Sequence, residues 1–362
     1  MKHMDLKALL KPSANWLFVF IPITLVLEHL GASDPLIFFA AALAIVPIAQ
    51  LIVQSTEQVA LHTGDAVGGL LNATFGNAPE LIISFVALKA GLYDLVLGSL
   101  AGAVLANALF ATGMGFLLGG LRKKEQLFNA QNARLLSSMM LIVVVSLMVP
   151  SAFYKAMEGR VGDDVISTLN VWVAVLLLVG YVLYLLFTMH THKDLFKAVN
   201  AGEEHEGPKP ALPKALFLLV LASVLAAFMS ETLVAAAEGT GEVLGLSQTF
   251  IGMIVLALVG GAAESFSAIA VARKDKLDMT LGITLGSSVQ IVLFVTPVLV
   301  LVSMLLDGPP LLIAFGTGTI LAVLLTALLT AVITSDGRSQ WFKGVQLLLV
   351  YAMIALVLYF LP

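Results

Sequence analysis

Two glutamates, Glu80 and Glu264, lie well inside long apolar stretches of the sequence. Glu80 follows Gly76-Asn77-Ala78-Pro79, and Glu264 follows Gly260-Gly261-Ala262-Ala263. A charge at the centre of a bilayer costs at least about 2.5–3.5 kcal/mol, even on lenient insertion scales. A structural role seldom justifies that cost, so both carboxylates are predicted to bind a cation.

The surroundings of each glutamate point to oxygen ligation of a hard cation. Ca²⁺ takes about 6–8 oxygens and two carboxylates supply at most four, so further donors are expected. Pro79 and the glycines weaken the helix, and freed carbonyls are tolerated at this depth only when they face protein or a water-filled cavity. Polar side chains lie at i,i+3 spacing beside Glu80 and on a later span. The predicted metal-binding set is Glu80, Glu264, Asn77, Ser287, Gln290, Gly76 and Gly260.

The same carboxylates predict coupling to protons. A site that needs both groups ionised to hold a divalent cation loses that cation when it is protonated. Ca²⁺ and H⁺ then compete for one pair of groups, and competition combined with alternating access gives antiport. The predicted proton-coupling residues include the cation-binding Glu80 and Glu264.

The composition indicates a membrane protein. Of the 362 residues, 59% are hydrophobic and 12% are charged, and the mean hydropathy is +1.01, whereas soluble domains are about 45–50% apolar and about 25% charged. The chain has no Cys, which excludes disulfides and thiolate metal sites. The expected partner is the lipid bilayer, and no nucleic-acid partner is expected. The oligomeric state is left open.

Eleven apolar segments are long enough to cross a bilayer, which requires about 20 residues each. With the N-terminus in the cytoplasm, all but three of the 19 Lys and Arg residues fall on the cytoplasmic side, as the positive-inside rule requires. The exceptions are Lys89, Lys155 and Arg160. The C-terminus is then outside. The predicted spans are 15–31, 36–54, 66–89, 94–120, 133–152, 165–189, 211–236, 248–272, 279–306, 311–334 and 341–361.

The two halves of the chain repeat each other at an offset of 184 residues. Gly76, Ala78, Glu80, Asp94, Leu97, Gly98 and Gly102 then match Gly260, Ala262, Glu264, Asp278, Leu281, Gly282 and Gly286. The repeated units begin five spans apart, so the copies cross the membrane in opposite directions, as in secondary transporters. The predicted organisation is an N-terminal helix (1–31), a five-helix repeat (36–189), a cytoplasmic linker (190–214) and a second inverted five-helix repeat (215–362).

These motifs resemble the two signatures of the Ca²⁺/H⁺ antiporter (cation/proton exchanger) family. The first is Gly76-Asn77-Ala78-Pro79-Glu80-Leu81-Ile82-Ile83, and the second runs from Gly260 to Leu285-Gly286-Ser287-Ser288-Val289-Gln290-Ile291. The resemblance implies an all-α polytopic membrane protein with eleven transmembrane helices. It also implies export of Ca²⁺ from the cytosol in exchange for H⁺, with Ca²⁺ as the substrate and no cofactor.

The resemblance also assigns further residues and marks two departures. The second-rank acidic positions of the family match Glu57 and Glu231, which are predicted to assist proton coupling. Gly261 stands where the second signature usually has Asn. Ala103 and Ala106 stand where the family has serines, with Asn107 one residue off, which puts cation selectivity in question. The short N-terminus suggests a prokaryotic-type protein of the cell (inner) membrane.

Three other functions fit the sequence less well. A Na⁺-coupled or Mn²⁺-preferring exchanger of the same superfamily is the nearest alternative, although the site offers few fixed ligands for Na⁺. An intramembrane protease built on His62 and Asp65 has no use for an inverted repeat, so the chain is not predicted to be an enzyme. A passive channel is the third alternative.

Overall fold

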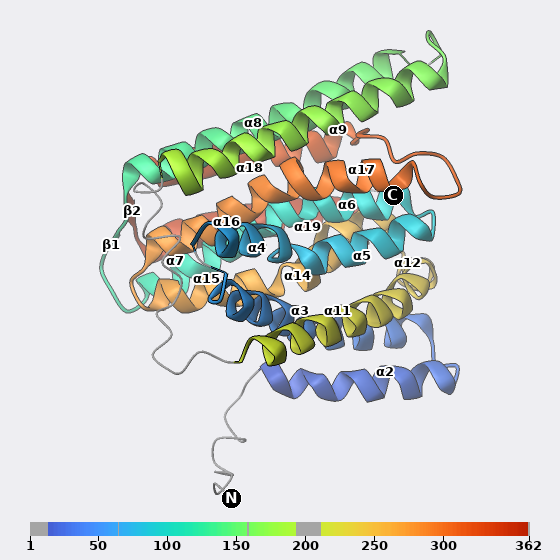
Figure 1. Cartoon of the computed structure of the whole chain (residues 1–362), viewed down its shortest axis with the longest axis horizontal. Helices are drawn as coiled ribbons and strands as arrows, with labels where there is room; N and C mark the ends of the chain where they lie inside the picture. The colour runs from blue at the N-terminus through green and yellow to red at the C-terminus, as the bar shows by residue number, and fades with distance from the viewer. Residues whose placement is uncertain (1–13, 64, 158, 193–210, 361–362) are drawn as a thin grey trace, which may run out of the picture.

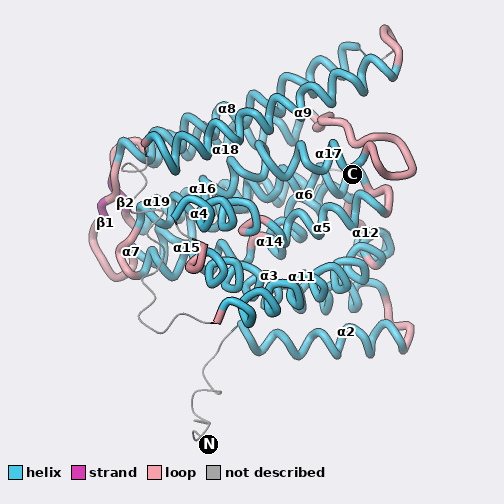
Figure 2. The backbone as a smooth tube through the Cα atoms, viewed as in Figure 1, coloured by secondary structure: helices cyan, strands magenta, loops and turns pink. Residues whose placement is uncertain are grey.

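The computed structural model describes residues 14–63, 65–157, 159–192 and 211–360, and almost all of them are helical (Figure 1). The loops lie mainly at the two ends of the helical bundle (Figure 2). The elements of the first half are η1 (Ala14–Val19), α2 (Phe20–His29), α3 (Asp34–Ala60), α4 (Asp65–Phe75), α5 (Ala78–Lys89), α6 (Tyr93–Leu105), η2 (Ala106–Ala111), α7 (Thr112–Gly120), β1 (Gln126–Leu127), α8 (Ala130–Met157), α9 (Asp163–Leu186) and η3 (Phe187–Thr191).

The second half is helical in the same way, and both halves contain short π-helical segments, of which η2, η5 and η6 lie inside longer helices and η3 ends one. Most of the predicted linker, residues 193–210, lies outside the described residues. The elements of the second half are α11 (Leu212–Ala235), α12 (Ala237–Leu244), α13 (Gln248–Phe250), η5 (Ile251–Leu256), α14 (Ala257–Gly260), α15 (Ala262–Arg273), α16 (Leu277–Gln290), η6 (Ile291–Val295), α17 (Thr296–Ser303), α18 (Thr317–Thr334), β2 (Arg338–Ser339) and α19 (Trp341–Phe360).

Within the described residues, eight helices are long and apolar enough to cross a membrane, or nine if a bent pair counts as one span. The bent pair is Gln248–Gly260 with Ala262–Arg273, which meet at 55°. The first predicted span is the shorter apolar helix Asn15–His29, and the third is divided into α4 and α5. The chain is therefore a multi-pass helical membrane protein, and the number eleven stays a prediction.

The long helices differ in the share of their residues that is buried. In an apolar 18-residue window of Tyr93–Gly120 that share is 89%, and in Leu277–Ser303 it is 67%, whereas in Asp163–Thr191, Leu212–Leu244 and Trp341–Phe360 it is 22% each. The peripheral helices present large apolar side chains outwards, including Trp172, Leu176 and Phe217. An outward apolar surface of this extent is expected to face lipid. The α6–α7 and α16–α17 helices therefore form the centre.

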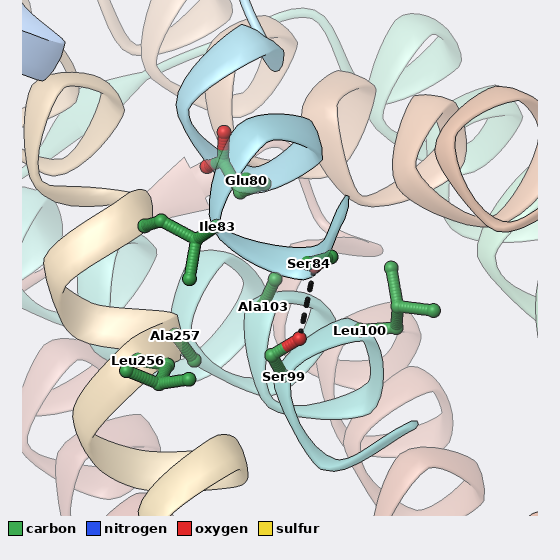
Figure 3. Close-up of a pocket in the computed structure, with 8 residues that line it drawn as sticks. All are labelled: Glu80, Ile83, Ser84, Ser99, Leu100, Ala103, Leu256 and Ala257. Carbon is green, nitrogen blue, oxygen red and sulfur yellow. Dashed lines mark hydrogen bonds between the residues drawn. The ribbon is translucent and has the colours of Figure 1, made fainter. Parts of the chain in front are cut away.

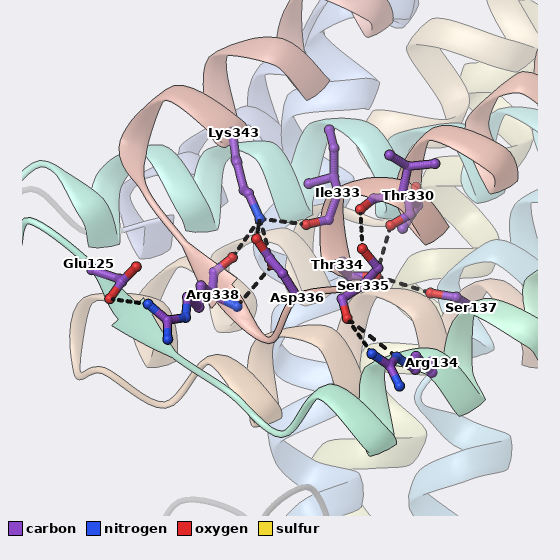
Figure 4. A network of polar contacts seen from close by, with 11 residues as sticks. Glu125, Arg134, Ser137, Thr330, Ile333, Thr334, Ser335, Asp336, Arg338 and Lys343 are labelled. Carbon is purple, nitrogen blue, oxygen red and sulfur yellow. Dashed lines mark hydrogen bonds and ion pairs between the residues drawn. The ribbon is translucent and has the colours of Figure 1, made fainter.

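A two-stranded antiparallel ribbon closes one end of the bundle, here called the ribbon end. The strands β1 and β2 pair in the register Gln126↔Ser339 and Leu127↔Arg338. Beside them, Arg338 forms an ion pair with Glu125 at 3.5 Å, and Lys343 Nζ donates to Asp336 Oδ1 at 2.7 Å (Figure 4). The opposite end carries the turn at Gly91 and is called the Gly91 end. The sequence analysis did not predict the ribbon.

A third loop joins this ribbon through Asp275, between α15 and α16. Asp275 forms an ion pair with Lys123 and accepts a bond of 2.8 Å from Gln126 Nε2. Its φ is +67°, in the left-handed region that a side chain usually avoids. The hydrogen bond from Lys123, followed by that from Gln126, lowers the pKa of the Asp275 carboxyl below its ordinary value. The carboxylate therefore accounts for an Asp in a backbone conformation that favours Gly.

Replacing Asp275 separates the backbone effect from the carboxylate effect. We expect Asp275→Ala to lower the melting temperature of the detergent-solubilised protein more than Asp275→Gly, because only Ala keeps the left-handed penalty of about 1–2 kcal/mol. A lowered pKa means that the carboxylate contributes stability above the ordinary value of 3.8 and loses it as the pH falls. The gap between wild type and Asp275→Gly should therefore shrink below that pH. Equal melting temperatures for the two variants would contradict this account.

Candidate functional site

Both predicted glutamates stand at the start of a helix, directly after a break. In the first half α4 ends at Phe75 and α5 begins at Ala78, so Glu80 is the third residue of α5. In the second half α14 ends at Gly260 and α15 begins at Ala262, so Glu264 is the third residue of α15. The sequence-based expectation that the helix is weakened beside each glutamate is confirmed.

The two breaks have the same backbone geometry. Asn77 has φ −96° and ψ 17°, and Gly261 has φ −79° and ψ 12°. The carbonyl of Asn77 accepts a bond of 3.0 Å from the amide of Leu81, and the carbonyl of Gly261 accepts one of 3.0 Å from the amide of Ser265. Each break therefore starts a new helix whose N-terminal amides favour a negative charge at the following glutamate.

The structure brings the two breaks together. A Cβ placed on Gly260 would lie 3.1 Å from Cγ and 3.6 Å from Cδ of Glu80, and one placed on Gly261 would lie 3.7 Å from Glu80 Oε1. The Glu80 side chain thus rests on the backbone that leads into α15 and towards Glu264. Glycine at position 260 provides the space for this contact, which is a more specific role than the one predicted for it.

Both carboxyl groups are buried, and within the described residues neither has a hydrogen-bond partner. Glu80 and Glu264 are each 5% exposed, and within the described residues none of their four oxygens has a hydrogen-bond partner. An ionised carboxylate in such surroundings is very unfavourable unless a cation or a proton neutralises it. The geometry therefore offers four carboxylate oxygens to a positively charged ligand.

Amide side chains from the two halves are hydrogen-bonded to each other at the first break. Asn77 Nδ2 donates to Gln290 Oε1 at 2.6 Å, which joins the first break to the end of α16. This bond uses the nitrogen of Asn77 and leaves its buried Oδ1 without a partner among the described residues. Two residues that the sequence predicted independently are thus in contact, and a neutral oxygen remains available next to Glu80.

Within the described residues, none of the other predicted residues is hydrogen-bonded to the two carboxylates. Ser287 is buried on α16, one turn before Gln290 and on the same helix face. Gly76 lies in the first break, where a Cβ would come within 2.6 Å of the carbonyl oxygen of Asn72. Glu57 is half-buried near the end of α3, and Glu231 is exposed on α11, so neither belongs to the buried pair.

The sequence analysis set aside one residue that the structure places at the site. Asn107 is 1% exposed, and in the part of the chain that is described neither its Oδ1 nor its Nδ2 has a hydrogen-bond partner. Its Oδ1 lies 3.4 Å from the position a Cβ would take on Gly261. Asn107 belongs to the π-helical segment η2, where the turn is wider than in an α-helix. An ungapped comparison of the halves put it one residue out of place.

A small cavity lies on the Gly91 side of Glu80 and is almost entirely apolar. Its lining includes Ile83, Leu100 and Leu256, together with Ser84 and Ser99, whose hydroxyls are hydrogen-bonded to each other at 3.1 Å. Figure 3 shows the Glu80 carboxylate pointing away from this serine pair. The cavity is therefore a packing gap beside Glu80 and adds no ligand to its carboxylate.

The donor set restricts which ions can bind. In the described residues no group of three or more His, Asp or Glu side chains could hold a metal. A cation here must be held by two carboxylates together with amide, hydroxyl or backbone oxygens. This set suits a hard cation such as Ca²⁺.

Comparison with known proteins agrees with this chemistry. The family model described as sodium/calcium exchanger protein matches residues 33–190 and 214–360. The chain is 39% identical to the Ca(2+)/H(+) antiporter of Aphanothece halophytica and 40% identical to that of Synechocystis sp., in each case over 96% of both chains. It also resembles the solved structure of native YfkE, with a TM-score of 0.81, 32% identity, and 95% of this chain and 100% of that one covered.

The contact between Gly260 and Glu80 gives a testable prediction. Gly260→Ala should push the Glu80 side chain aside and weaken Ca²⁺ binding about fivefold to a hundredfold, because overpacking of this kind costs about 1–3 kcal/mol. Calorimetric titration of the purified protein with Ca²⁺ measures the effect. Gly180→Ala on α9, where a Cβ meets nothing within 4 Å, is the control. Unchanged affinity in Gly260→Ala would show that the contact does not position Glu80.

Proposed function

The chain belongs to the sodium/calcium exchanger protein family, and from this membership and its site we infer that it is a Ca²⁺/H⁺ antiporter. It is a secondary transporter embedded in a membrane and is not expected to be an enzyme. The observation that carries the inference is the pair of buried carboxylates of Glu80 and Glu264, which have no partner within the described residues. Relatives of nearly the same length, 36–40% identical, carry the same activity in their names.

The buried pair explains why the two ions exchange. Glu80 and Glu264 need positive charge to be stable in an apolar surrounding, and either Ca²⁺ or protons can provide it. The two ligands therefore exclude each other, and the doubly ionised empty site is disfavoured. If the site opens to one side of the membrane at a time, cation moves one way and protons move the other.

We assign the Ca²⁺ ligands as an extension of this inference. The carboxylates of Glu80 and Glu264 bind the ion, and Asn77 Oδ1, Gln290 and Ser287 supply neutral oxygens, with backbone oxygen near Gly76 and Gly260. The amide of Asn107, unpartnered within the described chain, adds a donor from the first half. It compensates for the alanines at positions 103 and 106. Glu57 and Glu231, which lie apart from the pair, are proposed to pass protons towards it.

The proposed inverted repeat is supported by pairs of matched local features at the offset of 184 residues. Gly91 and Asp275 both have left-handed backbones, with φ of +77° and +67°. Thr112 Oγ1 donates to the carbonyl five residues earlier in η2, and Thr296 Oγ1 does the same in η6, at 3.0 and 2.9 Å. The division into residues 1–31, 36–189, 190–214 and 215–362 rests on this repeat, and the eleven proposed spans rest on the apolar segments and the distribution of basic residues.

The orientation follows from the distribution of basic residues. Lys123, Arg134, Arg338 and Lys343 gather at the ribbon end, which we therefore place in the cytoplasm. The C-terminus is then outside, the protein lies in the cell membrane, and Ca²⁺ is exported from the cytosol. A Na⁺-coupled or Mn²⁺-preferring exchanger is not favoured, because the full-length relatives are named for Ca²⁺ and H⁺.

Removing one carboxylate tests the site. Glu80→Gln and Glu264→Gln should each reduce Ca²⁺ uptake by inside-out vesicles under an imposed pH gradient about 30-fold or more, since losing one partner of a buried charge contact costs about 2–5 kcal/mol. Glu242→Gln, at an exposed position on α12, is the matched control. Normal uptake by either site variant would remove that residue from the mechanism.

The counter-ion is tested separately in proteoliposomes. Wild-type protein should accumulate Ca²⁺ when a pH gradient is imposed and should release protons in step, because both ions use one pair of carboxylates. A Na⁺ gradient at constant pH should drive no uptake. Uptake that follows the Na⁺ gradient and ignores the pH gradient would establish the alternative exchanger.

A further inference from the structure

At the Gly91 end, the two halves meet through glycine backbones. A Cβ placed on Gly98 of α6 would lie 3.1 Å from the carbonyl oxygen of Thr249 and 3.4 Å from Cα of Gly252. One placed on Gly102 would collide with the backbone of Met253, and one on Gly252 would lie 2.6 Å from the carbonyl oxygen of Leu95. The α6 and η5 backbones thus touch directly, which only small residues allow.

The repeat places a second set of glycines at the ribbon end. At the offset of 184, Gly98 and Gly102 match Gly282 and Gly286 on α16, and Gly252 matches Gly68 on α4. Met253 matches Gly69, which is smaller still. All the positions that permit the contact between α6 and η5 are therefore glycine in α16 and α4 as well.

The second glycine contact is not formed in this structure. Gly286 is buried, yet a Cβ on it would meet nothing within 4 Å. Gly68 instead rests on α3, where a Cβ would lie 2.7 Å from the carbonyl oxygen of Ala60, and the methyl end of the Met189 side chain covers Gly69. The backbones of the two halves are thus in direct contact at the Gly91 end, whereas at the ribbon end Gly286 of α16 has no such close neighbour and Gly68 of α4 packs on α3 instead.

We propose that the Gly68–Gly69 face of α4 and the Gly282–Gly286 face of α16 form the contact that closes the ribbon end in the alternate state. The contact between α6 and η5 opens as this one forms. The proposal rests on the Ca²⁺/H⁺ exchange and repeat proposed above, and it names the surfaces that alternate. Met189 acts as a flexible spacer, because its unbranched thioether fills the gap beside Gly69 and can leave it.

The arrangement links the closing surfaces to the cation site. Gly69 lies on the helix that leads into the break before Glu80, and Gly286 lies next to Ser287 and one turn before Gln290. Movement of α4 onto α16 would therefore cover the carboxylates from the ribbon end. At the Gly91 end, Gly252 precedes the break before Glu264 in the same way.

A larger residue at Gly286 should block closure, and in the structure described here a Cβ at this position meets nothing within 4 Å. We expect Gly286→Leu to keep its melting temperature and to bind Ca²⁺ within about threefold of wild type, while vesicle uptake falls about tenfold or more. Gly286→Ala should show a smaller loss. Gly318→Leu on α18, another position with nothing within 4 Å, is the control and should transport normally. Wild-type uptake by Gly286→Leu would overturn the proposal.

A disulfide cross-link tests the proposed contact between α4 and α16 directly, without relying on the size of an introduced side chain. The chain has no Cys, so the double variant Gly68→Cys/Gly282→Cys has no background thiols. Copper phenanthroline should join the pair during turnover, because the repeat-related Gly98 and Gly252 are in contact, and reduction should restore uptake. Failure to cross-link in protein that still exchanges Ca²⁺ for H⁺ would refute the closing contact alone. Loss of exchange in wild type would refute the proposed function instead.

Discussion

Two carboxylates buried in an apolar bundle must be neutralised in every state that the protein passes through. Glu80 and Glu264 share this requirement because each is almost inaccessible and none of the four oxygens has a partner in the described residues. The broken helices answer it in part, since each glutamate follows a fresh helix N-terminus that favours negative charge. The remaining charge must come from a bound ion, which makes the occupancy of the site obligatory and its two ligands mutually exclusive.

The glutamates and their surroundings could be predicted because their cost in a membrane is visible in the sequence. An intramembrane Glu beside Gly and Pro in two matched segments has few explanations, and the contact between Asn77 and Gln290 confirms that two predicted donors meet. Asn107 was harder to place, because the ungapped comparison of the halves pairs it with Ile291 and sets Ala106 opposite Gln290. The ribbon was missed because Gln126–Leu127 and Arg338–Ser339 are too short to show strand periodicity. The third span was predicted as continuous, although α4 and α5 are separate helices.

The halves share a local geometry but use it differently. At one end a Cβ placed on Gly91 would meet nothing within 4 Å. Its counterpart Asp275 forms an ion pair with Lys123 and a hydrogen bond with Gln126. Gly102 is pressed against a neighbouring backbone, whereas Gly286 has open space beside it. A structure built from two similar units is thus held in an unequal arrangement, and the inequality lies in helix–helix contacts rather than in the ion-binding groups themselves.

The π-helical segment η2 has a consequence for how the central helix can change. This helix presents Asn107 towards the carboxylates, and a few residues later it packs Gly113 against the backbone of Gly344 on α19, at 3.1 Å from a Cβ to the carbonyl oxygen. Deleting one residue would restore a regular helix, but it would turn one of these faces by about 100° relative to the other. The wide turn therefore fixes the rotation of Asn107 relative to Gly113 about the helix axis. A shift in register of one of these residues would displace the other.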